Sequence, residues 1–301
     1  MRIAAVLVAA ALAAGCNNAD GARSGKINVV ATTGMVADLA RVIGGEQVDV
    51  TALMGPGVDP HIYKASARDL DRLRAAQLIL YNGRHLEGRM GDVLIKVARK
   101  KPVVAVTEAI PDEKLLEPPE LDGHYDPHVW FDVSLWAETT TVVAAALAEL
   151  DPAHAALYHE RARVYKTQLL DLHADVKREL ATIPRKRRVL LTSHDAFRYF
   201  GRAYDLEVRG VQGISTVDAP GVKDIQEMAD LIGQRGIKAI FVESSVPRKA
   251  IEAVQIWVRR KGHDVVIGGT LFSDAMGDKP PTDTYVGMVR ANVRTVVDAL
   301  R

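Results

Sequence analysis

Two segments of the chain share the tripeptide Asp-Pro-His, once at residues 59–61 and again at residues 126–128. A proline restricts the backbone immediately before each histidine, which favours an imidazole held at the tip of a loop. A surface or helix-capping histidine is the ordinary interpretation of either position taken alone. The repeat therefore nominates His61 and His128 as candidate metal ligands without establishing that role.

The second half of the chain places a histidine and an aspartate shortly after two predicted strands. His194 lies just past the apolar strand predicted at residues 188–192, and Asp274 follows the strand predicted at residues 265–267 and a glycine pair. In open α/β sheets, ligands bind outside the carboxyl ends of the strands. His194 and Asp274 are therefore the ligand candidates that this architecture would supply.

Three imidazoles and one carboxylate form a four-ligand set typical of transition-metal sites. Zinc fits such a set of nitrogen and oxygen donors well, and manganese or iron fit it if the carboxylate binds through both oxygens. Calcium and magnesium, which prefer shells made of oxygen, fit it poorly. The four residues therefore predict a site for Zn2+, with Mn2+ and Fe2+ as alternatives.

Two further residues could support that site. Glu243 ends a predicted strand in the segment FVESS, where it could be a fifth ligand or, as we favour, an acceptor that orients an imidazole. A buried glutamate bonded to the backbone or to a lysine is the structural alternative. His124 lies in a polar loop, residues 110–125, and is a candidate accessory ligand. Neither residue is needed to complete the four-ligand set.

Strand and helix patterns alternate in both halves of the chain. In residues 26–150 and again in residues 185–301, short apolar runs typical of buried strands are separated by segments with helical spacing. Such alternation predicts parallel βαβ units with helices on both faces of a sheet. We therefore expect an α/β fold with an N-terminal lobe, a C-terminal lobe and mainly parallel sheets, with the metal site in the cleft between the lobes.

One long helical pattern lies between the two predicted lobes, over residues 151–184. Apolar side chains recur there every three or four residues, at Tyr158, Ala162, Tyr165, Leu169, Leu172, Val176, Leu180 and Ile183. Asp151 can cap the first turn of this helix. A helix that continued through Pro184 would lose a backbone hydrogen bond, so the helix should end there. A helix of this length would be about 45 to 50 Å long. We therefore expect a rigid spine that joins the lobes rather than an ordinary long helix inside one domain.

The composition is that of an ordinary globular protein. The 301 residues are 48% hydrophobic and 26% charged, which is enough chain for two hydrophobic cores. The 39 lysine and arginine residues nearly balance the 38 aspartate and glutamate residues, for a formal net charge of +1. This balance gives no reason to expect nucleic acid or an anionic surface as a partner.

The first 16 residues are typical of a secretory signal peptide. One arginine precedes an apolar run at residues 3–14, which is too short to span a bilayer. The segment LAAGC resembles a bacterial lipobox, in which the cysteine is lipidated and becomes the mature N-terminus. Cys16 is the only cysteine, and its position favours a lipid acceptor over a buried structural thiol. Residues 17–25 are small and polar, as in a flexible tether.

Six motifs resemble those of the metal-binding solute-binding proteins of zinc and manganese ABC transporters, the TroA-like or ZnuA-like family. In order they are DPHIYKASARDL, DPHVWFDV, LTSHDAFRYFGRAY, QGISTVDAP, FVESSVPRKAIE and GGTLFSDAMGD, and the match covers residues 26–301. The resemblance implies two α/β lobes joined by one long helix, with the metal buried between the lobes. It also implies that the four metal ligands are His61, His128, His194 and Asp274. High-zinc relatives often have a histidine-rich acidic loop at residues 110–125, where this chain has only His124.

The same resemblance implies an extracytoplasmic, lipid-anchored and monomeric receptor that captures a divalent metal and delivers it to the permease of an ABC transporter. We expect Zn2+ before Mn2+, because the third ligand is His194 where some manganese-binding relatives have glutamate. We expect no enzymatic activity. A zinc hydrolase is the competing enzyme class, although the sequence contains no HExxH segment. Lipidation alone would also fit a surface adhesin.

The spine and the ligands also predict how the protein behaves. A continuous helix without internal glycine or proline lacks a loop hinge for wide closure. We therefore expect metal loading to produce a small tilt between the lobes and local ordering of loops. Histidines bind metal only when neutral, so we expect the affinity for metal to fall as they protonate below about pH 6.

Overall fold

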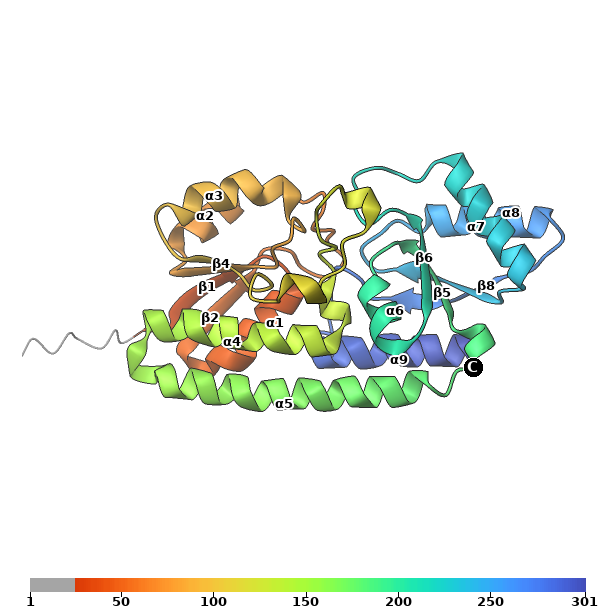
Figure 1. The fold of residues 1–301 in the computed structure, drawn as a ribbon. Coiled ribbons are helices and arrows are strands. Elements are labelled where there is room, and N and C mark those ends of the chain that lie inside the picture. Colours follow the sequence, from red (N-terminus) through yellow and green to blue (C-terminus); the bar gives the residue numbers. More distant parts are fainter. Residues whose placement is uncertain (1–24) are drawn as a thin grey trace, which may run out of the picture.

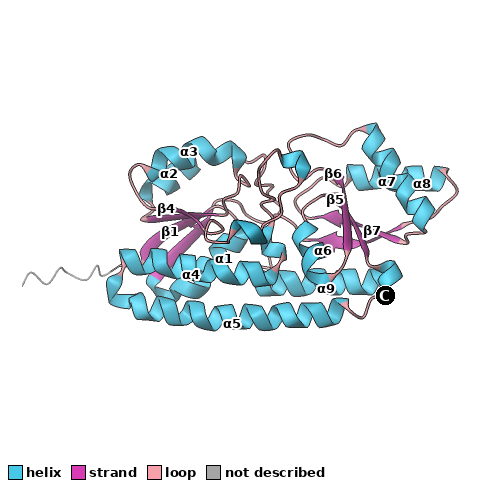
Figure 2. Cartoon of the chain, in the orientation of Figure 1, coloured by secondary structure: helices cyan, strands magenta, loops and turns pink. Residues whose placement is uncertain are grey.

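The computed structural model describes residues 25–301 (Figure 1). The signal peptide predicted at residues 1–16, its Cys16 and residues 17–24 of the predicted tether lie outside the described residues. The described chain forms two lobes of strands and helices side by side above a layer of long helices (Figure 2). The predicted α/β fold with mainly parallel sheets is therefore confirmed.

The N-terminal lobe is built on a four-stranded sheet in the order β2-β1-β3-β4, in which all neighbouring strands are parallel. Its strands are β1 (Ile27–Ala31), β2 (Val48–Ala52), β3 (Leu78–Tyr81) and β4 (Val103–Ala105), and its helices are α1 (Gly34–Gly44), α2 (Ala67–Ala75) and α3 (Gly91–Ala98). The side-chain oxygens of Thr33 and Ser66 cap the first turns of α1 and α2. Strand and helix alternate here as the sequence predicts.

The C-terminal lobe repeats this alternation. Its strands are β5 (Val189–His194), β6 (Glu207–Gln212), β7 (Ala239–Glu243) and β8 (Val266–Leu271), and its helices are α6 (Arg198–Tyr204), α7 (Val222–Arg235) and α8 (Lys249–Arg260). Strand β6 is parallel to β5 and β8 is parallel to β7, while β5 lies beside β7.

Two strand ends predicted for this lobe are wrong. Strand β5 continues to His194 instead of ending at residue 192, and β8 continues to Leu271 instead of ending at residue 267. The reason is pairing with neighbouring strands: His194 pairs with Gln212, and Leu271 pairs with Glu243. A local sequence pattern does not contain those partners. His194 is therefore the last residue of a strand, not a loop residue beyond it.

Three long helices form the layer beneath the lobes (Figure 1): α4 (Val133–Leu150), α5 (Ala155–Leu180) and α9 (Tyr285–Leu300). Helix α5 runs along the base of both lobes, and it packs against α4, α9 and α1. These three helices form a base common to both lobes, and α9 reaches it from the C-terminal lobe.

The buried face of the predicted spine is confirmed, but its length is wrong. The buried residues of α5 are Tyr158, Ala162, Tyr165, Leu169, Leu172, Val176 and Leu180, as the helical spacing predicts. The helix contains 26 residues, which at 1.5 Å per residue is about 39 Å. It is therefore shorter than the predicted pattern at both ends.

Local hydrogen bonds explain where α5 begins and ends. Residues Pro152–His154 form a separate 3₁₀ turn, and the Asp151 carboxylate accepts a hydrogen bond from the His154 ring instead of capping α5. At the other end, the backbone amide of Thr182 donates to the carbonyl of Glu179, three residues earlier. This tighter bonding takes the chain out of the α-helix before the proline is reached.

The lobes also meet through buried aromatic residues close to the base. Trp130 Nε1 donates a hydrogen bond to the carbonyl of Ser273 at 3.2 Å, and the Tyr285 hydroxyl donates to the carbonyl of Trp130 at 2.7 Å. The backbone amide of Tyr285 donates to the buried carboxylate of Asp38 in α1 at 3.1 Å. One hydrophobic cluster includes side chains from both lobes and from the base. Packing therefore joins the lobes in addition to the covalent spine.

Helix α4 is, within residues 25–301, the one helix long and apolar enough to cross a membrane by length and composition alone. Half of it is buried inside the fold, where it packs against α1 and α5. The core helix of a globular protein has the same character, and we interpret α4 in that way.

Leu169→Ala should lower the free energy of unfolding of the metal-free protein by about 2 to 5 kcal/mol, because it leaves a cavity at a fully buried position of α5. The adjacent Leu170 is the matched control. Its side chain is 43% exposed, so Leu170→Ala should change the free energy of unfolding by less than about 1 kcal/mol. Urea unfolding followed by circular dichroism measures both variants, and equal losses would contradict the buried stripe.

Candidate metal centre

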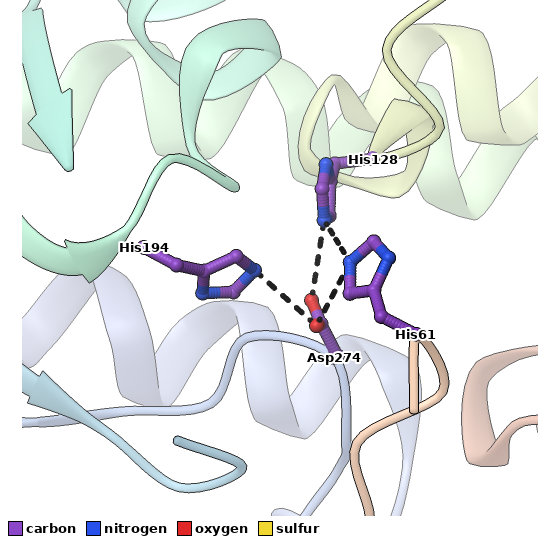
Figure 3. Close-up of side chains that lie close together, drawn as sticks. All are labelled: His61, His128, His194 and Asp274. Carbon is purple, nitrogen blue, oxygen red and sulfur yellow. Dashed lines mark hydrogen bonds and ion pairs between the residues drawn. The ribbon is translucent and has the colours of Figure 1, made fainter. Parts of the chain in front are cut away.

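Four side chains from four different segments meet between the lobes (Figure 3). His61 lies in the turn after β2, His128 comes immediately before the 3₁₀ turn Val129–Phe131, His194 ends β5, and Asp274 lies in the loop after β8. All four are buried, and each offers a ligand atom within 4.8 Å of the others. The structure thus brings together the four residues that the sequence nominates as metal ligands.

The repeated Asp-Pro-His tripeptide builds the same turn twice. Asp59 Oδ1 accepts a hydrogen bond from the backbone amide of His61 at 2.9 Å, and Asp126 Oδ1 accepts one from the amide of His128 at 2.9 Å. An aspartate bonded to the amide two residues later forms an Asx turn, and the proline between them has its φ already fixed. The aspartate of each tripeptide therefore also predicts the turn that holds the histidine, in addition to the proline.

Carboxylates also orient two of the imidazoles toward the centre. Asp126 Oδ1 lies 2.7 Å from Nδ1 of His128. Glu243 accepts a hydrogen bond from the backbone amide of His194 at 2.7 Å, and its second oxygen bonds to Nδ1 of the same ring. A proton held at Nδ1 leaves Nε2 with a lone pair for a metal. Glu243 thus has the geometry of an acceptor that orients His194, which is the role favoured for it from the sequence.

The other polar atoms of the cluster face one another. Asp274 Oδ2 lies 3.5 Å from Nε2 of His61 and 3.3 Å from Nε2 of His194, and Oδ1 lies 3.5 Å from Nε2 of His128 (Figure 3). Among the described residues, neither Asp274 oxygen makes a hydrogen bond, nor does Nε2 of His194. Buried polar atoms are nearly always hydrogen-bonded. Nε2 of His61 and Nε2 of His128 lie 3.2 Å apart, within hydrogen-bond distance. A buried set of three imidazoles and a carboxylate in which three polar atoms lack a hydrogen bond has the chemistry of a cation site.

Burial and neighbouring carboxylates set the protonation of two of the histidines. Burial lowers the pKa of His61 to about 3, although Asp274 opposes this effect. His61 is therefore neutral and able to bind metal at mildly acidic pH. Burial also disfavours charge on His194, but the carboxylates of Glu243 and Asp274 outweigh it and hold the pKa of His194 well above its usual value.

Asp274 responds in the opposite direction. Burial alone would raise the pKa of its carboxyl group, but the neighbouring histidines, His194 first among them, hold this pKa below its usual value. The carboxylate is therefore ionised wherever the protein is folded at ordinary pH. It supplies a full negative charge to the centre of the cluster.

His124, the candidate accessory ligand, lies apart from these four side chains. Its exposed ring packs edge-on against the exposed ring of His85, with the ring centroids 4.6 Å apart. Both rings line a surface cavity of about 480 Å³ that is also lined by Arg84, Glu108 and Tyr125. The structure therefore does not bring His124 into the metal cluster.

Comparisons with known proteins point to proteins named for metal binding. A family model described as "Zinc-uptake complex component A periplasmic" matches residues 29–299. The chain is 47% identical to the manganese-binding lipoprotein MntA of Bacillus subtilis, over 99% of this chain and 98% of that protein. It is also 47% identical to the zinc-binding protein TroA of Treponema pallidum, over 99% and 98%. The metal ABC transporter substrate-binding lipoprotein SsaB of Streptococcus sanguinis is 29% identical, over 95% and 93%.

A solved structure agrees with these sequence relatives. The periplasmic zinc-binding protein TroA from Treponema pallidum matches this fold with a TM-score of 0.89 at 49% sequence identity. The match covers 92% of this chain and 99% of that one. The similarity therefore includes both lobes and the base.

Metal binding at neutral pH should release about one proton per ion, because the raised pKa of His194 leaves that ring protonated before the metal arrives. The apparent affinity should then rise about tenfold per pH unit through neutral pH, not only below about pH 6 as ordinary histidines would predict. Calorimetry in buffers of different ionisation enthalpy measures the proton count.

Glu243→Gln tests whether the raised pKa of His194 causes the proton release. It removes the charge that raises the pKa of His194 most strongly, so less than one proton should be released at neutral pH. His159→Gln is the control, because His159 is exposed on α5 and its loss should leave the count unchanged. Binding by the wild-type protein that is independent of the buffer would contradict this account of His194.

Proposed function

Because the chain belongs to the family of the periplasmic zinc-uptake component, we propose that it is the substrate-binding protein of an ABC transporter that takes up a divalent transition metal. In this role the protein captures the ion outside the cytoplasm and delivers it to a membrane permease. The names of the relatives MntA, TroA and SsaB support both the cargo and the kind of transporter.

The observation that carries this proposal is the convergence of His61, His128, His194 and Asp274 in one buried cluster. Two of these residues precede α5 and two follow it, so each half of the chain contributes half of the donors. An ion held there is enclosed by both lobes and separated from bulk solvent. Such enclosure suits a protein that carries a metal from one place to another.

The cluster favours binding over catalysis. A catalytic zinc site keeps an open position for water, whereas four protein ligands complete a tetrahedral shell. Glu243 is the carboxylate nearest to the role of a general base, and it is engaged with the amide and the ring of His194. We therefore propose that the chain has no hydrolase activity, in keeping with its family of transport proteins.

We propose Zn2+ as the preferred ion, with Mn2+ second and Fe2+ third. Three imidazole nitrogens favour zinc, whereas manganese prefers oxygen ligands. Both oxygens of Asp274 face the cluster, so this carboxylate can bind through both and offer Mn2+ a fifth donor. Sequence identity to the relatives does not favour Zn2+ over Mn2+, because the relatives named for manganese and for zinc are both 47% identical to this chain.

The proposed partners are the permease and a bacterial membrane, which the protein reaches through a lipid on Cys16. The relatives MntA and SsaB are named lipoproteins, which supports the anchor. We propose a monomer, because one chain supplies all four ligands. The adhesin alternative is not favoured, since these names describe metal binding and transport.

His61→Ala combined with His128→Ala should weaken the affinity for Zn2+ by more than about 100-fold, because half of the four ligands are lost. The wild-type chain without residues 1–16 should bind one equivalent of metal. Calorimetry after chelator treatment, together with metal analysis of the purified protein, measures both.

His124→Ala is the matched control for these variants. It removes an exposed histidine outside the cluster and should leave one equivalent bound with wild-type affinity. Tight binding of one equivalent by the double variant would show that the ligand assignment is wrong. A loss of affinity in His124→Ala would instead give His124 an accessory role.

Cys16→Ser should move the protein from the membrane fraction to the soluble extracytoplasmic fraction, because it removes the side chain that would carry the lipid. Mass spectrometry of the N-terminal peptide of the wild-type protein should show acyl chains on this cysteine. An N-terminal peptide of the wild-type protein without acyl chains would contradict lipid anchoring.

A further inference from the structure

The loop between β6 and α7 comprises residues 213–221 and starts beside His194, one of the four residues of the buried cluster. It begins directly after Gln212, the residue that pairs with His194 at the end of the sheet, and it arches at the top of the view in Figure 1. The Gln212 side chain donates a hydrogen bond to the carbonyl of Asp218 at 2.7 Å, and Ile214 is buried. The base of this β6–α7 loop is therefore anchored in its own lobe.

The tip of the β6–α7 loop reaches across to the other lobe. Thr216 Oγ1 donates a hydrogen bond to Asp59 Oδ2 at 2.5 Å. It is the only hydrogen bond, among those of residues 25–301, between this loop and the N-terminal lobe. Its neighbours Ser215 and Val217 are exposed. The loop is therefore hydrogen-bonded to the N-terminal lobe at one residue.

Asp59 links this bond to the metal cluster. Its Oδ1 accepts the amide of His61 in the Asx turn, while its Oδ2 accepts the Thr216 hydroxyl. The carboxylate is buried, and a hydrogen bond to a charged acceptor is stronger than one between neutral groups. The lobes approach closely nearby, since a Cβ at Gly57 would lie 3.5 Å from the carbonyl oxygen of Ser244. One side chain thus fixes a ligand-bearing turn and the loop opposite it.

We propose that the Thr216–Asp59 hydrogen bond is a latch that slows the exchange of metal between the cluster and solvent. Thr216 is a positioning residue, because it acts through Asp59 on His61 and does not itself touch the metal. The opposite side of the lobe interface is held by Trp130 and Tyr285. Tyr199, whose hydroxyl donates to the carbonyl of Asp126, and the ion pair of Arg198 with Glu120 also join the lobes. The β6–α7 loop is hydrogen-bonded to the N-terminal lobe only through Thr216 among residues 25–301, and we expect it to open when that bond breaks. This inference rests on the proposed metal-binding function.

Thr216→Val tests the latch, because it removes the hydroxyl and nearly preserves the shape of the side chain. The full chain in detergent is loaded with Zn2+ and mixed with excess EDTA, and the release of zinc is followed by stopped-flow with a zinc-sensitive dye. We expect Thr216→Val to release zinc about tenfold faster than wild type, as the loss of one charge-assisted hydrogen bond predicts. Thr216→Ser keeps the hydroxyl and should release zinc within about twofold of the wild-type rate.

Two further variants serve as a control and as a replacement for Thr216→Val. Thr182→Val removes a hydroxyl that bonds to Glu179 at the far end of α5, and it should release zinc at the wild-type rate. Thr216→Ala should match Thr216→Val, and it replaces that variant if circular dichroism shows the valine protein to be unfolded. A role in stability alone would change the melting temperature of these proteins without changing the rate of release.

The outcomes separate the latch from the function on which it rests. If all the proteins load one equivalent of zinc and Thr216→Val releases it at the wild-type rate, the latch is overturned and metal binding stands. If Thr216→Ser releases zinc as fast as Thr216→Val, the hydroxyl is not what holds the loop and the latch is again overturned. If the wild-type protein loads no zinc, the proposed function and the latch fall together.

Discussion

Burial of the polar side chains of His61, His128, His194 and Asp274 between two lobes is the constraint on which the rest of this structure depends. Imidazoles and carboxylates removed from water lose hydration free energy, which only hydrogen bonds and opposite charges can offset. Asp126 and Glu243 supply such bonds at the rings of His128 and His194, and each also accepts the backbone amide of its histidine. The imidazoles proposed to bind the metal are thus held in place by carboxylates outside the four-residue cluster.

The same constraint explains the charge at the centre. Asp274, Glu243 and Asp126 lie against the imidazoles, and within the described part of the chain none of them forms an ion pair with a lysine or an arginine. A doubly charged cation balances this excess of carboxylates better than a singly charged one. The charge of the cluster therefore favours a divalent cation, and its nitrogen and oxygen donors favour a transition metal.

Features set by neighbouring residues in sequence could be predicted, and features set by distant partners could not. The buried stripe of α5 follows from spacing along a single helix, whereas the start of that helix depends on what the Asp151 side chain bonds to. The ends of β5 and β8 depend on pairing with β6 and β7. The sequence nominates the four candidate ligands by their places after strands and in a repeated tripeptide, and the resemblance to a family makes them a set. Spacing alone could not show that they converge, because they lie on four separate segments.

An ion held by this cluster, as we propose, has to enter and leave, and the structure limits how this happens. The base is fixed by α5, which has no hinge, and by the bonds of Trp130 and Tyr285 across the lobes. Each histidine is also held in place, by its turn or by the strand that it ends. Asp274 differs, because its carboxylate is held only by the charges of the imidazoles around it. In our proposal, the freedom needed for exchange therefore lies in the loops around the cluster, where the Thr216–Asp59 hydrogen bond connects the β6–α7 loop to the other lobe.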